Sequence, residues 1–255
     1  MPIDLAAAID DFWKARARKE CFPRVYFDRL TVDEAYRIQL AMIDRRVASG
    51  ERQIGWKVGL TAKPIQDQFG HHEPVFGCIL ESHPTGHVFS PNELINPGFE
   101  SELCIRLGAG LQGEISADQA RAAVHFVFPS LEIIETRGDL AGQLALALVD
   151  NAQQRAIVVG APASLDLDAA LDMVAVRVQL NGRDAATGFG AAVLGNPLNS
   201  ILWLAGKLDQ YGRRLRPGDI VMTGSFVRQF PLVPGDTAVA EFSGIGRVEA
   251  GIAKT

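Results

Sequence analysis

The sequence has 255 residues, of which 47% are apolar and 22% are charged, and its formal net charge is −5. This composition is typical of a folded globular protein and excludes a disordered chain. Because no run of lysine and arginine extends beyond a few residues, the sequence lacks the basic surface of a protein that binds nucleic acid or an anionic membrane. The length allows one large domain, or a core domain with a smaller addition.

Targeting and redox signals are absent from the sequence. The N-terminus, Met1-Pro2-Ile3-Asp4, lacks the cationic start and apolar run of a signal peptide. The longest apolar stretches, such as Leu144 to Val149, are too short to cross a bilayer. Cys21, Cys78 and Cys104 are odd in number and widely spaced, so they predict neither a disulfide framework nor a zinc site. We therefore expect a soluble cytoplasmic protein.

The first 52 residues are predicted to form a small helical part. Apolar residues recur at helical spacing between Asp4 and Lys19. Thr31 and Glu34 have the spacing of a capping box, which predicts the start of a second, amphipathic helix that ends near Gly50.

From Gln53 onward the sequence changes to short strand-like runs punctuated by Gly and Pro. The patterns predict strands over 102–107 and 130–136, a helix over 117–128 and another over 198–211. The alternating run Met173 to Leu180 ends at Asn181-Gly182, the dipeptide that favours a type I′ hairpin. Pro-Gly turns before residues 219 and 236 each lead into a strand. The fold class is therefore α+β, with a mixed-β domain over 53–255 that packs against the helical part over 1–52.

Two glutamates give the sharpest chemical signal. In an extended segment Glu100 and Glu102 project from the same face, while Leu103 and Ile105 occupy the other face. Two such carboxylates repel each other unless a cation lies between them or one is protonated. A solvated edge strand is the alternative interpretation.

A third carboxylate, Glu132, lies in an apolar run that should be buried. A buried carboxylate is costly unless it is paired or bound to a metal, and pairing with Arg137 is the alternative to metal binding here. Three carboxylates without a His or Cys partner form a hard ligand set, which suits Mg²⁺ or Mn²⁺ better than Zn²⁺ or Cu²⁺.

Two further segments have the chemistry to meet this acidic cluster. Lys57 lies in an apolar, strand-like stretch between two glycines, where it is either a snorkelling surface lysine or a cation that faces the glutamates and polarises a substrate oxygen. Met222-Thr-Gly-Ser225 follows a predicted strand as a loop of small residues, and its backbone N–H groups and the Ser225 hydroxyl can hold a carboxylate.

These motifs occur together in an order that resembles a known group of enzymes. The ordered motifs are Gly-Trp-Lys57-Val-Gly-Leu-Thr61, Glu100-x-Glu102, Leu131-Glu132-Ile-Ile-Glu-Thr-Arg137, Asp150-Asn-Ala, Gly188-Phe-Gly-Ala-Ala-Val-Leu-Gly-Asn-Pro and Gly-Asp-Ile-Val-Met-Thr-Gly224-Ser225. Together they resemble the 2-oxopent-4-enoate hydratase and 4-oxalocrotonate decarboxylase group of the fumarylacetoacetate hydrolase superfamily, through nearly the whole chain.

The resemblance implies a mixed-β core and an Mg²⁺ or Mn²⁺ ion held by Glu100, Glu102 and Glu132. It also implies a small 2-oxo acid substrate from the meta-cleavage breakdown of aromatic compounds. Within the matching segments, the expected catalytic residue is Lys57. The expected substrate-binding residues are Lys57, Thr61, Gly77, Leu131, Gly224 and Ser225. We also expect a homo-oligomer, and association with a homologous hydratase or decarboxylase is a further expectation from the resemblance.

The expected reaction is the metal-dependent hydration of 2-hydroxypenta-2,4-dienoate to 4-hydroxy-2-oxopentanoate, or the same reaction on a close homologue. The alternative is decarboxylation of 4-oxalocrotonate on the same scaffold, because Val75 stands where many hydratases of this group have an Asp. A second alternative is C–C hydrolysis of an acylpyruvate, which needs a His/Glu dyad. The candidates for such a role are His71, His72, Glu73 and Asp67. The alternative is that the two histidines are solvent-exposed loop residues without a catalytic role. A non-catalytic partner subunit is the third alternative.

Overall fold

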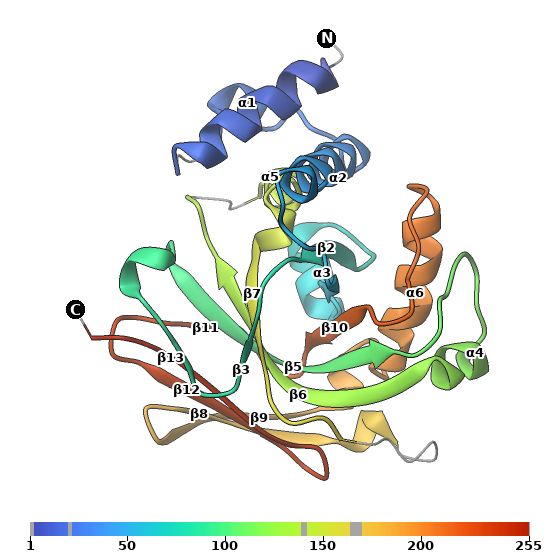
Figure 1. Cartoon of the computed structure of the whole chain (residues 1–255), viewed down its shortest axis with the longest axis vertical. Coiled ribbons are helices and arrows are strands. Elements are labelled where there is room, and N and C mark those ends of the chain that lie inside the picture. The colour runs from blue at the N-terminus through green and yellow to red at the C-terminus, as the bar shows by residue number, and fades with distance from the viewer. Residues whose placement is uncertain (1–2, 20–21, 139–141, 164–169, 255) are drawn as a thin grey trace.

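The structure is a computed structural model that describes residues 3–19, 22–138, 142–163 and 170–254. Across these ranges the chain forms two sheets and six α-helices (Figure 1). The α-helices are α1 (Leu5–Ala17), α2 (Val32–Ala48), α3 (Lys63–Phe69), α4 (Ala117–Ala122), α5 (Leu144–Val149) and α6 (Leu198–Asp209). Short 3₁₀ turns are η1 (Arg24–Tyr26), η2 (Pro91–Glu93), η3 (Asn151–Gln153), η4 (Leu171–Met173) and η5 (Gly190–Ala192).

The larger sheet carries the candidate site. In pairing order its strands are β2 (Val75–Ile79), β1 (Gly55–Gly59), β10 (Ile220–Ser225), β5 (Pro97–Leu107), β6 (Val124–Glu135), β7 (Gln154–Val159) and β3 (Ser82–Pro84), and β11 (Phe230–Pro231) pairs with β5. The two longest strands, β5 and β6, are antiparallel neighbours in the middle of this order. Both are largely buried, so polar side chains on them lie in a poorly solvated environment.

The smaller sheet lies at the opposite end of the molecule from α1 and α2, with the larger sheet between them (Figure 1). Its strands pair in the order β4 (His87–Phe89), β13 (Gly246–Ile252), β12 (Thr237–Phe242), β8 (Ala175–Leu180) and β9 (Arg183–Phe189). β12 and β13 pack against β6. The hairpin between β8 and β9 turns at Asn181 and Gly182, whose φ angles of 54° and 73° confirm the predicted type I′ turn.

The N-terminal helices begin where the sequence predicts. The Asp4 side chain accepts hydrogen bonds from the N–H groups of Ala6 and Ala7 at the start of α1. At the start of α2, Thr31 and Glu34 form the predicted capping box. α2 packs against both α1 and α5. The division of the chain at residue 52 remains a prediction.

The fold class is confirmed as mixed α+β, but three local expectations are wrong. The helix expected over 117–128 ends at Ala122, and β6 already begins at Val124. Its first residues, Val-His-Phe-Val-Phe, are β-branched and aromatic, and their pairing with β5 outweighs helical continuation. The small-residue loop expected at 222–225 is the end of strand β10. β5 is not an edge strand, because it lies between β10 and β6.

Two other expectations concern the cysteines and the membrane. Cys78 and Cys104 are buried and free, and Cys21 lies outside the described residues. No helix in the described part of the chain has both the length and the apolar character needed to cross a bilayer.

Candidate metal centre

Three glutamates from the two central strands converge on one face of the larger sheet. Glu100 and Glu102 alternate with Ser101 on β5, and Glu132 on β6 lies directly opposite Glu100 in the register of the pair. Residues opposite each other in an antiparallel pair project from the same face. One carboxylate oxygen from each of the three lies within 4.8 Å of the others. The strand register therefore builds the acidic cluster that the sequence predicts.

The environment of these carboxylates is almost without water. Glu102 and Glu132 are fully buried, and Glu100 is close to them with partial exposure. Glu102 Oε1 and both carboxylate oxygens of Glu132 have no hydrogen-bond partner in the structure. A buried charged oxygen without a partner costs several kilocalories per mole unless a cation or a proton satisfies it.

Lys57 supplies one positive charge to this cluster. Its Nζ atom lies 3.4 Å from Glu132 Oε1, and the lysine side chain is 6% exposed. The snorkelling alternative is therefore wrong, because the ammonium group points into the protein and not to solvent. Arg137 does not pair with Glu132; it pairs with Glu135 and Asp150.

The pKa values show how poorly one lysine balances three carboxylates. Burial raises the pKa of all three glutamates, that of Glu102 well above its ordinary value and that of Glu132 to about 7. The neighbouring glutamates raise the pKa of Glu102 further. Burial acts to lower the pKa of the Lys57 ammonium, but the combined attraction of the glutamates outweighs it and raises that pKa. A divalent cation would remove the need for these protons.

The end of β10 completes one side of the cluster. The Gly224 N–H donates a hydrogen bond of 2.8 Å to Glu102 Oε2. This contact depends on an irregularity between Met222 and Ser225, where the register with β5 shifts. Gly224 has φ +115°, and a Cβ atom there would lie 2.6 Å from the Thr61 side chain. The position therefore requires glycine for both backbone conformation and space.

The other predicted substrate-binding residues differ in how they lie relative to the glutamate cluster. Thr61 is buried against Gly224, and Gly77 pairs with Lys57 in neighbouring strands. The Ser225 hydroxyl donates to the Ser101 carbonyl at 3.3 Å. Leu131 is fully buried on the face of β6 opposite to Glu132, because side chains alternate along a strand. Only the backbone of Leu131 can therefore contribute on the face of the sheet that carries the glutamates.

Residue 75 offers no proton near the lysine. Val75 is buried in β2 and pairs with Gly59, two residues from Lys57, so its side chain lies on the lysine face of β1 and β2. A Cβ atom built on Gly59 would lie 3.3 Å from both Lys57 Nζ and Val75 Cγ2. The lysine thus has an apolar neighbour at this position.

The predicted dyad candidates lie around α3. His71 Nε2 is 3.9 Å from Glu73 Oε1, but Lys207 Nζ holds the same oxygen at 2.8 Å. His72 is largely exposed, and its Nδ1 lies 3.4 Å from Asp67 Oδ1. Glu73 is therefore engaged by a lysine and forms no close pair with His71. This geometry gives no support to the hydrolase alternative.

Comparison with known protein families agrees with this arrangement. The family model described as fumarylacetoacetate (FAA) hydrolase C-terminal matches residues 60–253, which include all three glutamates. The chain belongs to the fumarylacetoacetate hydrolase family. The resemblance that the ordered motifs indicate is thus confirmed.

Individual members of the fumarylacetoacetate hydrolase family extend the comparison. The chain is 36% identical to a 2-hydroxyhexa-2,4-dienoate hydratase of Comamonas testosteroni over 227 residues, covering 85% of this chain and 84% of that protein. It is 34% identical to a 2-keto-4-pentenoate hydratase of Paraburkholderia xenovorans (strain LB400) over 230 residues, covering 87% and 84%. A solved structure of a 4-oxalocrotonate decarboxylase from Pseudomonas putida G7, complexed with magnesium and adipate, aligns with TM-score 0.90 and 29% identity over 97% of both chains.

Two residues that support this family fold at the site were not predicted to have a role. The Ser130 hydroxyl donates to the Glu102 carbonyl at 2.8 Å and shares the glutamate face. The Asn151 side chain bonds both the N–H and the carbonyl of Cys78, and its own carbonyl lies over Gly77. Asn151 belongs to the motif Asp150-Asn-Ala, which is a sequence signal, but the signal does not say which strand the side chain contacts.

Proposed function

We propose that this protein is a divalent-metal-dependent lyase that hydrates 2-hydroxypenta-2,4-dienoate, the enol of 2-oxopent-4-enoate, or a close homologue. The product is the corresponding 4-hydroxy-2-oxo acid, in the meta-cleavage breakdown of aromatic compounds. The observation that carries the proposal is the buried cluster of Glu100, Glu102 and Glu132 with Lys57 beside it. The homologous hydratases support the choice of reaction.

The residues of the cluster fit a divalent metal. Three carboxylates provide only oxygen ligands, and three of their buried oxygen atoms lack a hydrogen-bond partner among the described residues, Lys57 being the ion-pair neighbour of one of them. Hard cations such as Mg²⁺ and Mn²⁺ prefer this donor set. We propose Glu100, Glu102 and Glu132 as the ligands, and the magnesium in the decarboxylase structure is in keeping with that choice. Such an ion, when bound, acts as a Lewis acid that draws electron density from the 2-oxo group.

The chain's own groups then have separate tasks. Lys57 is the cation that contacts Glu132 among the described residues, so its ammonium group stabilises negative charge that develops on the C2 oxygen or holds the substrate carboxylate. The Gly224 N–H fixes the orientation of Glu102. The apolar Val75 and the burial of the site exclude bulk water, which strengthens each of these electrostatic contacts. In the hydratase reaction a proton is added at C5 and water at C4.

The second candidate is decarboxylation of 4-oxalocrotonate, and one observation favours it. Val75 has no proton to give or take, yet it lies on the lysine face. Hydration needs proton transfer and an activated water near C4 and C5, whereas loss of CO₂ from a vinylogous oxo acid only delivers electrons to the same 2-oxo group. The small 2-oxo acid is common to both candidates. Assembly into a homo-oligomer remains a prediction from the resemblance.

One assay separates the two reactions. The purified protein is incubated with 2-hydroxypenta-2,4-dienoate or 4-oxalocrotonate, with Mg²⁺, with Mn²⁺ or with excess chelator, while ultraviolet absorbance and CO₂ release are followed. Metal-dependent loss of the dienoate without CO₂ supports the hydratase. CO₂ release from oxalocrotonate supports the decarboxylase and gives Val75 a part in that preference. Full turnover in chelator would contradict the metal-dependent mechanism for either substrate.

A further inference from the structure

A second polar cavity lies away from the glutamate cluster, between the N-terminal helices and the larger sheet. It has a deep part of about 30 Å³ and an adjoining outer part of about 610 Å³. Five residues line both parts, namely Arg16, Arg46, Arg137, Asp150 and Asn151. None of the three glutamates of the candidate metal centre lines either part. The junction of the two parts is therefore a site of its own.

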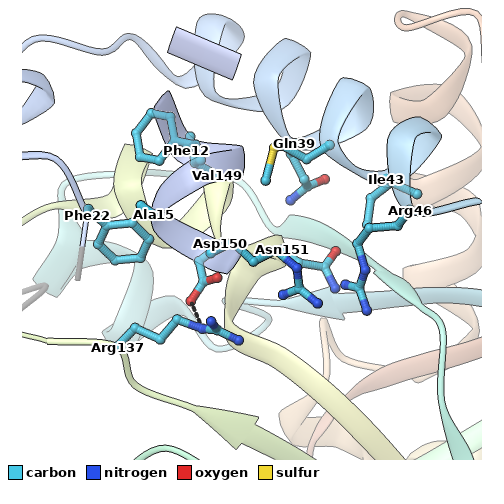
Figure 2. Close-up of a pocket in the computed structure, with 12 residues that line it drawn as sticks. Phe12, Ala15, Phe22, Gln39, Ile43, Arg46, Arg137, Val149, Asp150 and Asn151 are labelled. Carbon is cyan, nitrogen blue, oxygen red and sulfur yellow. Dashed lines mark ion pairs between the residues drawn. The ribbon is translucent and has the colours of Figure 1, made fainter. Parts of the chain in front are cut away.

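The walls of this cavity differ in character. In Figure 2 the apolar side chains Phe12, Phe22 and Val149 gather on one side of the deep part. Arg46 of α2 and Arg137 approach from different sides, with Asp150 and Asn151 between them (Figure 2). Apolar walls with a few convergent polar groups are typical of small-ligand sites, and the outer part is in the usual size range.

The charges of the deep part are not balanced. Its charged residues are three arginines, Arg16, Arg46 and Arg137, and a single carboxylate, Asp150. Arg46 is held by Glu51 through two hydrogen bonds of 2.8 and 2.6 Å. Arg137 donates to Glu135 at 2.9 Å and lies 3.2 Å from Asp150. Each of these three carboxyl partners is thus already engaged by an arginine.

Arg16 is the unpaired member of this cluster. Among the residues that the structure describes, no acceptor forms a hydrogen bond or an ion pair with its guanidinium. Burial and the like charges of Arg46 and Arg137 lower its pKa to about 10, although Glu51 and Asp150 attract it. A partly buried guanidinium next to two others is unfavourable unless an anion joins them.

One more group at the junction lacks a hydrogen-bond partner. Arg137 Nε is buried and donates no hydrogen bond, although Asp150 is close. Burial raises the pKa of Asp150 to about 7, so that its negative charge is only partly present at neutral pH. The arginines at the junction are matched in number by Glu51, Glu135 and Asp150, but guanidinium donors on Arg16 and Arg137 remain without acceptors among the described residues.

We propose that this junction is a binding site for a small oxyanion, a carboxylate or a phosphate, held by the guanidinium groups of Arg16, Arg46 and Arg137. Carboxylates and phosphates match the planar, two-pronged donor geometry of arginine. The outer part of the cavity accommodates the rest of the ligand. The site does not depend on the proposed catalytic reaction.

The test measures binding without turnover. Metal-free protein in excess chelator is titrated calorimetrically with inorganic phosphate or succinate, and its melting temperature is measured in each anion against chloride at equal ionic strength. The variants are Arg16→Gln, Arg16→Lys and, as a matched control, Lys14→Gln. Lys14 is an exposed cation on the same helix and lines neither part of the cavity.

We expect phosphate or succinate to raise the melting temperature of the wild type by several degrees more than chloride. Arg16→Gln should weaken binding about tenfold or more, Arg16→Lys less, and Lys14→Gln not at all. A response to phosphate alone assigns a phosphate ligand, and a response to succinate alone assigns a carboxylate. In chloride, Arg16→Gln should melt at or above the wild-type temperature, because it removes repulsion between like charges.

Three results would overturn the site. The first is that neither anion stabilises the wild type more than chloride does. The second is that Arg16→Gln binds the anion as tightly as the wild type. The third is that Arg16→Gln melts several degrees lower in chloride, since this would make Arg16 a structural residue that already has its partners. A failure of Arg16→Gln to fold is the extreme form of the third result and would overturn the site in the same way.

Discussion

Replacing Lys57 by Met removes the positive charge beside Glu132 and keeps most of the apolar stem. At 3.4 Å between Lys57 Nζ and Glu132 Oε1, the attraction is about 5 kcal/mol for an effective dielectric constant near 20. The free energy of unfolding of the variant falls by less than this attraction energy. The lysine no longer has to be desolvated, and Glu132, whose pKa is about 7 even beside the lysine, binds a proton instead.

The proton sets the expected size of the effect. Keeping a carboxyl group neutral costs about 1.4 kcal/mol for each pH unit above its pKa. Protonation of Glu132 at pH 8 therefore costs on the order of 1 kcal/mol. We therefore expect metal-free Lys57→Met to lose about 1–2 kcal/mol at pH 8, or about 2–8 °C in melting temperature. The loss should shrink at pH 6, where Glu132 is already protonated, and also when Mg²⁺ supplies the missing charge.

Activity should respond more strongly than stability. If the ammonium group stabilises charge in the transition state, kcat/KM of Lys57→Met with saturating Mg²⁺ falls about tenfold or more. Lys207→Met is the control, because Lys207 is also an ion-paired lysine with little exposure, its Nζ 2.8 Å from Glu73. The control should lose less stability, because Glu73 is 40% exposed, and should keep kcat/KM within about threefold. A kcat/KM for Lys57→Met within about twofold of the wild type would refute a catalytic role.

Three further predictions concern the metal centre, the backbone beside it and the buried Asp150. Glu102→Gln should lower Mn²⁺ affinity, measured by calorimetry, about 100-fold or more, because it removes a charged ligand. Turnover should be abolished while the fold stays intact, and full activity of the variant would refute the metal centre. Gly224→Ala should cost about 1–3 kcal/mol in denaturant unfolding and weaken metal binding, because its Cβ would lie 2.6 Å from Thr61. Gly212→Ala, also at positive φ but with no atom within 4 Å, should cost only the backbone strain and leave metal affinity unchanged. Asp150 has a pKa of about 7 when folded, so its contribution to stability is present at acid pH and lost as pH rises through 7. With Mg²⁺ present, Asp150→Asn should remove about 2 kcal/mol of the decline in stability between pH 5 and pH 7, and an unchanged profile would contradict the shifted pKa.

The sequence by itself determined the local features of this protein, and it pointed to the family. Alternation along one strand places Glu100 and Glu102 on one face whatever the rest of the chain does. The capping box at Thr31 and Glu34 and the hairpin at Asn181-Gly182 depend on residues only one to three positions apart, and both form as predicted. Their physical determinants are backbone donors and allowed φ angles, which neighbouring residues control.

Only the tertiary structure decided which residues from distant parts of the sequence become neighbours. Glu132 reaches the other glutamates because β6 pairs with β5 in one register, and Lys57 reaches Glu132 from a strand separated from β6 by β10 and β5. Pairing also overrode local expectation at Val124, where a predicted helix is a strand. Arg16 has no sequence signal at all. In the sequence it does not differ from an ordinary surface arginine. Only the packing of α1 brings it beside Arg46 and Arg137. Burial and the proximity of distant segments set the charge balance there, and no local sequence pattern encodes either of them.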